Sequence, residues 1–323
     1  MTDRELKNFY HQVLLPQLKS IEKQRLQAVF HIFYATVCGC LIAVTFLLTH
    51  KLDLTATFCL PCTFILLGTG GYFVTSGYNK FSKYKTHFKK TIVKQIVKQF
   101  DPDWKYFHDR KIKTTDFDRS GLLRTTYSRI NGDDLVVGQI EKTKFYSSEL
   151  HIEKQVQTGK SSSYKTLFKG LFFFADFNKN INSETYLFQK SSNSFSKFLS
   201  NSIQSLFGTF NSGKGEYVTV ENQELNELFD IYTTNQQEAR YILTPHIIEA
   251  ILSLNKKLRR PINLSFKENR VYISIHFGID LFEPRLFSTN VNYSDIRFMK
   301  ALFETNIILV RELNLNTRIW TKD

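Results

Sequence analysis

The chain has 323 residues, of which 43 are Lys or Arg and 30 are Asp or Glu, so its net charge is +13. At about 150 residues per domain, this length leaves room for one or two domains. Apolar residues make up 42% and aromatic residues 15%, which excludes a disordered or collagen-like chain. Only four cysteines occur, so the chain is no small secreted domain held by disulfides.

Two long stretches near the N-terminus, residues 26–50 and 54–79, contain no charged side chain. At about 1.5 Å rise per residue, a helix of either length crosses a hydrocarbon core of about 30 Å. The alternative is a buried helical hairpin inside a large soluble core. A signal peptide is disfavoured, because Asp3, Glu5 and Glu22 precede the first apolar stretch. The sequence therefore predicts two transmembrane helices, which the short connection makes an antiparallel hairpin.

The charges beside these stretches predict their orientation. Lys19, Lys23 and Arg25 precede the first stretch, whereas the connection carries one Lys and one Asp. Lysines also follow the second stretch. Because basic flanks stay on the cytoplasmic side of a membrane, we expect a multi-pass protein with both termini in the cytoplasm.

Small residues lie inside both apolar stretches. A metal or redox site is one interpretation of the cysteines, but the sequence offers no zinc-ligand set and lipid does not favour reactive thiolates. Cysteine also packs well as a small apolar residue, and glycines allow helices to approach closely. We therefore expect no metal and no cofactor here. The residues concerned are Cys38, Cys40, Cys59, Cys62, Gly68, Gly70, Gly71 and Gly77.

More than half of the excess positive charge lies directly after the second stretch. Between residues 80 and 98 there are seven lysines and no acidic residue, and apolar residues recur there at helical spacing. This pattern predicts a basic amphipathic neck helix whose lysines contact anionic lipid headgroups. We expect no nucleic acid partner, because no basic stripe or RNA-binding motif follows. The lysines are Lys80, Lys83, Lys85, Lys89, Lys90, Lys94 and Lys98.

Beyond the neck, the pattern changes to strands followed by interleaved helices, which predicts an α+β domain with a largely antiparallel sheet and covering helices. Residues 127–130 and 135–140 flank Asn131 to Asp134, which we interpret as a hairpin turn. Further strands are expected at 143–156, 167–177, 185–189, 217–220, 262–266 and 270–277. Helices are expected at 222–229, from 234 or 235 onward, at 244–258 and at 294–311. The predicted segments are an N-terminal cytoplasmic helix (1–27), the transmembrane hairpin (28–78), the neck (79–101) and the cytoplasmic domain (102–323).

The segment from residue 189 to 215 is rich in serine, yet its apolar residues keep helical spacing. We interpret it as an amphipathic helix that covers the sheet, with a membrane-surface helix as the alternative. Gly208 to Gly215 matches a phosphate-binding loop in part. It lacks the terminal Ser or Thr and has the wrong flanking elements, so we expect no nucleotide there.

Several blocks of the chain resemble bacterial membrane proteins of domain-of-unknown-function family 3137. The resemblance covers about residues 100–320 and includes the paired apolar stretches ahead of the domain. It implies a bacterial inner membrane setting but supplies no catalytic residues. The blocks are Gly132-Asp133-Asp134, Ser148-Glu149-Leu150, Phe168 to Phe172, Asp176-Phe177, Phe229 to Tyr232, Glu238 to Pro245 and Leu313 to Trp320.

Glu238 and Arg240 belong to the most specific of these blocks. We expect Arg240 to be a half-buried structural guanidinium, with a ligand carboxylate or phosphate as the alternative partner. The acidic residues of the Gly132 to Asp134 turn could bind a cation, although turn chemistry alone explains them. The eight histidines show no metal-ligand spacing.

No catalytic constellation is present in the sequence, so we predict no enzyme and no catalytic residues. The leading interpretation is a membrane protein whose cytoplasmic domain binds a protein, a second copy of the chain or a lipid. The alternative is a membrane-tethered enzyme that acts on lipid or envelope substrates. A transporter is disfavoured because the two stretches contain no carboxylate.

Overall fold

The computed structural model describes residues 2–52, 56–123, 125–159, 161–177, 180–190, 215–289, 292–313 and 315. The chain forms two compact units. The first comprises Met1–Gln99 together with Phe282–Met299, and the second comprises Phe100–Leu281 together with Lys300–Asp323. The segment 282–299 therefore packs with the N-terminal helices. The predicted boundaries instead assign it to the domain 102–323.

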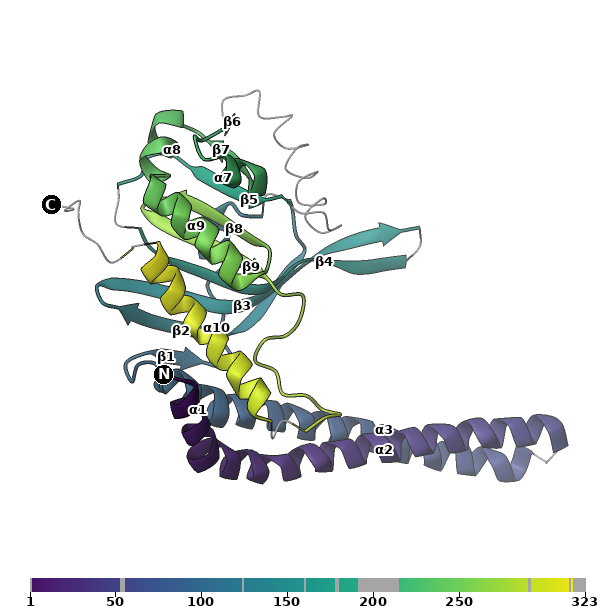
Figure 1. Cartoon of the computed structure of the whole chain (residues 1–323). Coiled ribbons are helices and arrows are strands. Elements are labelled where there is room, and N and C mark those ends of the chain that lie inside the picture. Colours follow the sequence, from purple (N-terminus) through teal and green to yellow (C-terminus); the bar gives the residue numbers. More distant parts are fainter. Residues whose placement is uncertain are drawn as a thin grey trace. The chain divides into compact units, whose positions relative to one another are not determined.

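The first unit is helical. Thr2 starts α1 (Asp3–Phe9) with a capping box, in which Glu5 reaches back to the backbone N–H of Thr2. A short π-helical turn, η1 (Tyr10–Leu14), leads into the long helix α2 (Leu15–Leu52). After the connection, α3 (Ala56–Phe88) continues through η2 (Lys89–Val93) into α4 (Lys94–Lys98). The predicted neck helix is thus present as an extension of α3 (Figure 1).

Helices α2 and α3 lie side by side, and two glycines of α3 lie at close contacts with α2 (Figure 1). A Cβ atom added to Gly70 would lie 3.3 Å from the Cβ of Cys38. One added to Gly77 would lie 3.2 Å from Cγ1 of Ile32. Nothing lies within 4 Å of such an atom at Gly68 or Gly71. The predicted role in close helix packing is therefore confirmed for two of the four glycines.

The other end of the first unit has a packed apolar core. It combines residues from three parts of the chain: α1 to the start of α2, the end of α3 to α4, and the segment 282–299. The neck residues that recur at helical spacing face this core, as amphipathic periodicity predicts. The fully or nearly fully buried side chains include Leu6, Leu14, Leu18, Ile21, Tyr84, Phe88, Ile92, Ile96, Phe282, Ile296 and Met299.

The second unit is built on a nine-stranded antiparallel sheet in the order β1-β2-β3-β4-β9-β8-β5-β7-β6 (Figure 1). The strands are β1 (Lys105–Phe107), β2 (Arg129–Ile140), β3 (Thr143–Thr158), β4 (Ser161–Asp176), β5 (Thr185–Gln189), β6 (Glu216–Val218), β7 (Phe229–Thr233), β8 (Ile262–Lys267) and β9 (Arg270–His276). The helices are α5 (Thr114–Ser120), α7 (Gln223–Leu228), α8 (Gln236–Ile242), α9 (Pro245–Leu258) and α10 (Tyr293–Glu312), of which α10 begins in the first unit. The predicted α+β class with a large antiparallel sheet is confirmed.

The sheet carries a core on both faces, which explains the nearly continuous apolar run of β4. Phe172 and Phe174 belong to a cluster with Leu150 and Tyr272, which α5 covers through Phe117. Phe173 points to the opposite face, because side chains alternate along a strand, and it stacks on Phe145. Because β4 lies in the middle of the sheet and is buried on both faces, it needs apolar residues at successive positions.

Most predicted helix starts and late strands are confirmed. The side chain of Asn222 accepts a hydrogen bond from the N–H of Leu225 at 2.8 Å and caps α7. Pro245 occupies the first turn of α9. Glu268 and Asn269, both with positive φ, form the tight turn between β8 and β9. The strand β7 lies between the helices expected at 222–229 and from 234 or 235 onward, and the sequence did not predict it. The amphipathic helix expected over 189–215 and the partial phosphate-loop match at Gly208 to Gly215 fall almost wholly on residues 191–214, which lie outside the described residues.

The hairpin turn predicted at Asn131 to Asp134 is wrong. β2 runs without interruption from Arg129 to Ile140, and its register with β3 shifts between Asp133 and Val136, as in a β-bulge. A Cβ on Gly132 would lie 2.3 Å from the backbone oxygen of Glu149, so this glycine allows close strand approach. Glu141, with φ of 54°, lies in the actual turn between β2 and β3.

Candidate functional site

The neck lysines differ in their surroundings. Lys83, Lys90, Lys94 and Lys98 are exposed, and Lys80 is half-buried. Lys89 is buried, and its ammonium lies 2.8 Å from Oε1 of Glu283. The ammonium of Lys85 lies 2.8 Å from Oε2 of the same carboxylate. Lys85 and Lys89 therefore neutralise Glu283, whereas the four exposed lysines face solvent.

Further polar contacts fix the segment 282–299 within the first unit. Arg25 donates hydrogen bonds to Glu22 at 2.6 Å and to the backbone oxygen of Leu286 at 2.7 Å. Burial raises the pKa of Asp295, although the neighbouring Arg285, which donates a hydrogen bond to it, opposes that shift. Charged residues of the neck and of α2 therefore also serve as structural anchors, a role that the sequence did not indicate because their partners lie between 194 and 261 positions away.

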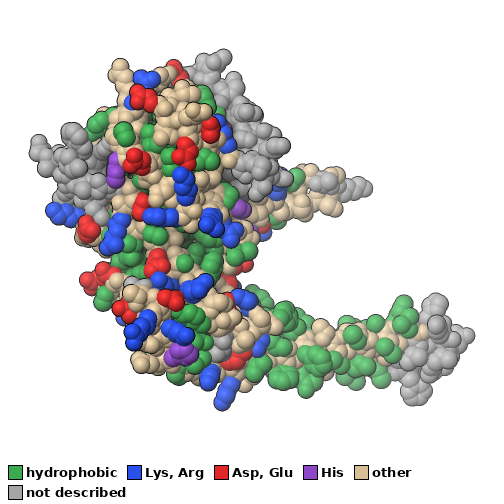
Figure 2. Space-filling model, viewed as in Figure 1, with side chains coloured by type: hydrophobic (Ala, Val, Ile, Leu, Met, Phe, Trp, Pro, Cys, Tyr) green, Lys and Arg blue, Asp and Glu red, His purple; other side chains and the backbone are tan. Residues whose placement is uncertain are grey.

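The outer surface of α2 and α3 is apolar and exposed. Phe30 is 59% exposed, and Phe46 and Phe64 are each 69% exposed. Figure 2 shows apolar side chains along both helices. One described helix, Asp3–Leu47, is long and apolar enough to cross a membrane, and none of its most apolar stretch is buried. Other exposed apolar residues on these helices include Phe33, Leu41, Val44, Ile65, Leu67 and Val74.

Glu238 has a structural position on α8. Its carboxylate accepts a hydrogen bond from the backbone N–H of Asn182 at 2.8 Å. Burial by itself raises the pKa of Glu238, but hydrogen bonds from Ser183 and from the backbone of Asn182 and Ser183 outweigh that effect and lower it. Glu238 thus ties α8 to the segment that leads into β5.

Arg240 is exposed, which corrects the prediction of a half-buried guanidinium. One helical turn of α8 directs Ala239 and Ile242 into the core, and Arg240 faces away from it. It lines a pocket of about 670 Å³ between the β6–α7 connection, α8 and the first turn of α9. The other lining residues are Thr219, Val220, Glu221, Asn222, Leu243, Pro245, Ile248 and Glu249.

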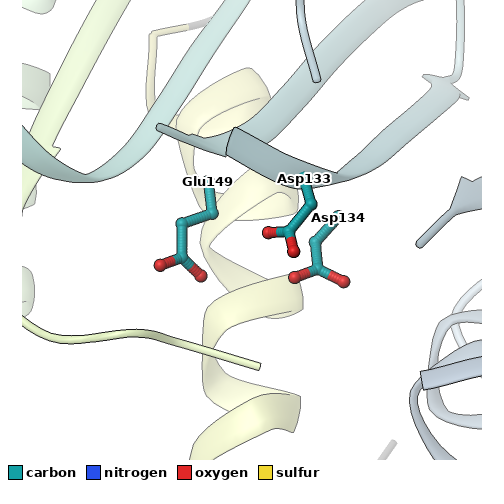
Figure 3. Close-up of side chains that lie close together, drawn as sticks. All are labelled: Asp133, Asp134 and Glu149. Atoms are coloured by element: carbon teal, nitrogen blue, oxygen red, sulfur yellow. The ribbon is translucent and has the colours of Figure 1, made fainter. Parts of the chain in front are cut away.

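An acidic cluster lies beside the β2 bulge (Figure 3). Carboxylate oxygens of Asp133, Asp134 and Glu149 lie within 4.8 Å of one another, and Asp134 and Glu149 are buried. Tyr106 donates a hydrogen bond to Asp134, and the N–H of Leu281 donates one to Glu149 at 2.9 Å. Three carboxylates suit a hard cation such as Ca²⁺, and they are the described residues that could hold one. The sequence pointed to Asp133 and Asp134, but only strand register adds Glu149.

These features define an α+β protein that combines a nine-stranded antiparallel sheet with a long, exposed apolar helix near its N-terminus. A family model described as "Protein of unknown function (DUF3137)" matches residues 166–315, from within β4 to three residues beyond the end of α10. This match supports the family resemblance seen in the sequence.

Comparison with solved structures finds a likeness to the mycobacterial trehalose monomycolate transport factor A, TtfA. The two chains are 11% identical, and the likeness covers 68% of this chain and 93% of that chain with a TM-score of 0.30. No curated protein matches the chain.

Proposed function

We propose that this chain is a multi-pass protein of the bacterial inner membrane. In this proposal α2 and α3 cross the bilayer as a hairpin, and both termini lie in the cytoplasm. The second unit is then a cytoplasmic module that binds a partner at the membrane.

The exposed apolar surface of α2 and α3 is the observation that carries the proposal. Burying apolar area stabilises a structure by about 25 cal/mol per Å², so a surface that exposes Phe30, Phe46 and Phe64 to water is costly. Large contiguous apolar patches of this kind mark membrane or protein contacts. Because α2 has no charged residue between Arg25 and Lys51, a hydrocarbon environment matches its residues 26–50.

Membrane extraction tests the anchor. We expect the full chain to remain in the membrane pellet after washing with alkaline carbonate and to dissolve only in detergent. Ile42→Asp together with Leu66→Asp, on the apolar stretches of α2 and α3, should release the chain, whereas Lys142→Asp with Lys144→Asp should not. Release of the wild-type chain by carbonate alone would contradict an integral membrane anchor.

Reporter fusions test the orientation. A reporter attached after Asp323 should be active only in the cytoplasm, because basic residues flank both helices on the side of the termini. A reporter inserted at Asp53 should be active only outside it. The opposite pair of results would overturn the proposed topology.

The exposed neck lysines support a contact with anionic headgroups. Each Lys near such a surface contributes about 1 kcal/mol, and salt screens this attraction over about 8–10 Å. We expect the full chain in nonionic detergent to bind beads coated with phosphatidylglycerol. Replacing Lys83, Lys90, Lys94 and Lys98 by Glu should abolish that binding. Replacing four exposed lysines of the second unit should preserve it, and equal binding by both variants would contradict a headgroup site at the neck.

The pocket beside Arg240 favours a second role, the binding of a small ligand. A guanidinium binds carboxylates and phosphates with two parallel hydrogen bonds, and Val220, Leu243 and Ile248 supply apolar walls. This arrangement supports the ligand interpretation of Arg240. It also keeps a membrane-tethered enzyme as the alternative to a binding module.

A further inference from the structure

Hydrogen bonds hold the walls of the pocket beside Arg240 in place. In the connection between β6 and α7, the N–H of Val220 donates a hydrogen bond to Oδ1 of Asn226 at 3.0 Å. In return, Nδ2 of Asn226 donates one to the carbonyl of Val220 at 2.6 Å. The side chain of Asn235 caps the start of α8. Because these contacts involve only the chain's own groups, the walls are fixed before a ligand binds, which lowers the cost of binding.

The floor of the pocket is apolar. Leu243 and Ile248 line it and are buried. On α9, Pro245, Ile248 and Glu249 are three and four positions apart, so they share the helix face that lines the pocket. The described lining residues include no aromatic ring on which a nucleotide base could stack. The pocket therefore suits a small molecule that is held by a few polar groups above an apolar floor.

Three charged side chains line this pocket and do not neutralise one another. Arg240 contributes a guanidinium, and Glu221 and Glu249 contribute carboxylates, all of them exposed. Within the part of the chain that the structure describes, none of the three takes part in an ion pair. In contrast, the carboxylate of Glu224 on α7 lies 2.9 Å from the ammonium of Lys256. The pocket therefore offers one positive and two negative groups to a ligand.

A ligand with a single kind of charge matches only part of this set. An anion is attracted by the guanidinium but repelled by the two carboxylates, and the reverse holds for a cation. A zwitterion is attracted by both kinds of group. Because Arg240 lies beyond ion-pair distance from Glu221 and Glu249, the two ligand charges must also be separated. An α-amino acid, which carries both charges on one carbon, fits less well than a zwitterion with a short chain between them.

We propose that this pocket binds a zwitterion of the ethanolamine phosphate type, in which two carbons separate a phosphate oxygen from a primary ammonium group. Arg240 donates two parallel hydrogen bonds to the phosphate, and Glu221 and Glu249 accept hydrogen bonds from the ammonium. Such a group occurs as the headgroup of a lipid and in free small molecules. This inference rests on the proposed ligand-binding role of the pocket and names the class of ligand that it takes.

Titration calorimetry of the full chain in nonionic detergent tests the inference. The probe is glycerophosphoethanolamine, which carries the complete zwitterionic group and no acyl chain. Two further probes each lack one charge. Glycerophosphoglycerol keeps the phosphodiester without the ammonium, and ethanolamine keeps the ammonium without the phosphate. We expect the zwitterion to bind at least tenfold more tightly than either, because only the zwitterion is attracted by both kinds of protein charge.

Variants of the pocket separate the two charge contacts. Arg240→Gln should weaken the binding of glycerophosphoethanolamine at least tenfold. Glu221→Gln with Glu249→Gln should weaken it by a similar factor. The same double variant should bind glycerophosphoglycerol more tightly than the wild-type chain does, because no carboxylate then repels the phosphate. A merely structural role of the two carboxylates would not reverse the preference in this way.

Matched controls change exposed residues of the same unit that do not line the pocket. They are Arg119→Gln, and Glu224→Gln with Glu227→Gln, and both should bind glycerophosphoethanolamine like the wild-type chain. Circular dichroism melting checks that every variant folds. Equal loss of binding in the pocket variants and in the controls would overturn the inference.

Phosphatidylethanolamine added to the detergent distinguishes the two sources of the group. A lipid ligand should displace glycerophosphoethanolamine from the wild-type chain at a lower concentration than unlabelled headgroup does, whereas a free ligand should compete at least as well as the lipid. Either result supports the inference and assigns the source. The displacement should disappear in Arg240→Gln, which has no bound probe to lose.

Three results would overturn the inference: no binding of glycerophosphoethanolamine at millimolar concentration, equal binding of all three probes, or tighter binding of glycerophosphoglycerol to the wild-type chain. Glycerophosphoglycerol that binds through Arg240 with no preference for the ammonium contradicts the zwitterion but leaves the pocket as an anion site. If neither phosphodiester depends on Arg240, the proposed ligand role of the pocket fails as well. Carbonate extraction tests the membrane anchor independently of all these measurements.

Discussion

At the scale of single residues, Glu238 and Arg240 show how two neighbours on one short helix acquire different roles. The carboxylate of Glu238 accepts a hydrogen bond from the backbone of Asn182 and so connects two segments of the second unit. Arg240 is exposed beside the pocket. Their spacing of two residues already placed them on different helix faces. Which face would be buried depended on the packing of Ala239 and Ile242.

Replacement of Arg240 tests its position. Arg240→Ala should change the melting temperature of the full chain in detergent by no more than about 1 °C, because exposed substitutions usually alter stability by less than about 0.5 kcal/mol. Glu238→Ala should lower it by several degrees, since it leaves the N–H of Asn182 without its acceptor. A large loss of stability in Arg240→Ala would show that the guanidinium has a structural partner.

At the scale of secondary-structure elements, the two long strands β2 and β3 depend on a close approach at Gly132. An added methyl group there would meet the backbone oxygen of Glu149 at 2.3 Å and the side chain of Leu150 at 2.9 Å. This oxygen belongs to the backbone of β3, which is hydrogen-bonded to β2, so it can move away only if the two strands separate. The bulge beside it also brings Asp133 and Asp134 next to Glu149.

Gly132→Ala should therefore destabilise the protein by about 2 kcal/mol or more, through strain at the β2–β3 ladder. Thermal unfolding of the full chain in detergent measures the effect. Gly71→Ala is the control, because nothing lies within 4 Å of a Cβ at that helical position. A neutral Gly132→Ala would mean that the two strands are farther apart than the structure indicates.

The ion pair between Arg129 of β2 and Glu153 of β3 leads to a prediction about how stability depends on pH. The hydrogen bond from Arg129 lowers the pKa of Glu153 below its usual value of 4.5, although burial opposes this shift. A carboxylate with a lowered pKa in the folded state stabilises the fold fully above its unfolded pKa and loses this contribution as pH falls through its folded pKa. At pH 7, the melting temperature of Arg129→Met should therefore lie below that of the wild-type chain, and the difference between the two melting temperatures should shrink below about pH 4.5. For Lys142→Met, the difference in melting temperature from the wild-type chain should not change with pH in this way.

At the scale of the whole molecule, two separate segments of the chain, Met1–Gln99 and Phe282–Met299, form the first unit. Residues 282–299 leave the sheet unit and pack with the N-terminal helices, where Phe282 and Ile296 are buried. Glu283 pairs with Lys85 and Lys89, and Arg25 holds the carbonyl of Leu286. A domain boundary at residue 102, which the sequence suggests, therefore separates residues 282–299 from the N-terminal helices with which they pack.

A fragment of residues 100–323 should consequently aggregate, because it exposes the apolar side chains of Phe282 and Ile296 to water. The control fragment replaces residues 282–299 with a Gly/Ser linker of the same length and should elute as a monomer. Size-exclusion chromatography compares the two. A monodisperse 100–323 fragment would show that this segment does not need the helical unit.

The sequence by itself determined the features that depend on local pattern. Uncharged length predicted the two long helices, helical spacing predicted the amphipathic neck, and capping residues such as Asn222 and Pro245 predicted helix starts. Apolar runs predicted the central strand β4 and the antiparallel sheet. These signals succeed because hydrogen bonding and amphipathic burial repeat every few residues along the chain.

Only the tertiary structure decided what distant residues do to one another. Glu283 converts two predicted lipid-facing lysines into an ion-paired anchor, and strand register adds Glu149 to the acidic residues of the β2 bulge. Such pairings join residues separated by up to about 200 positions, and no periodicity within a single segment encodes them, because their energy arises only when separate elements pack together.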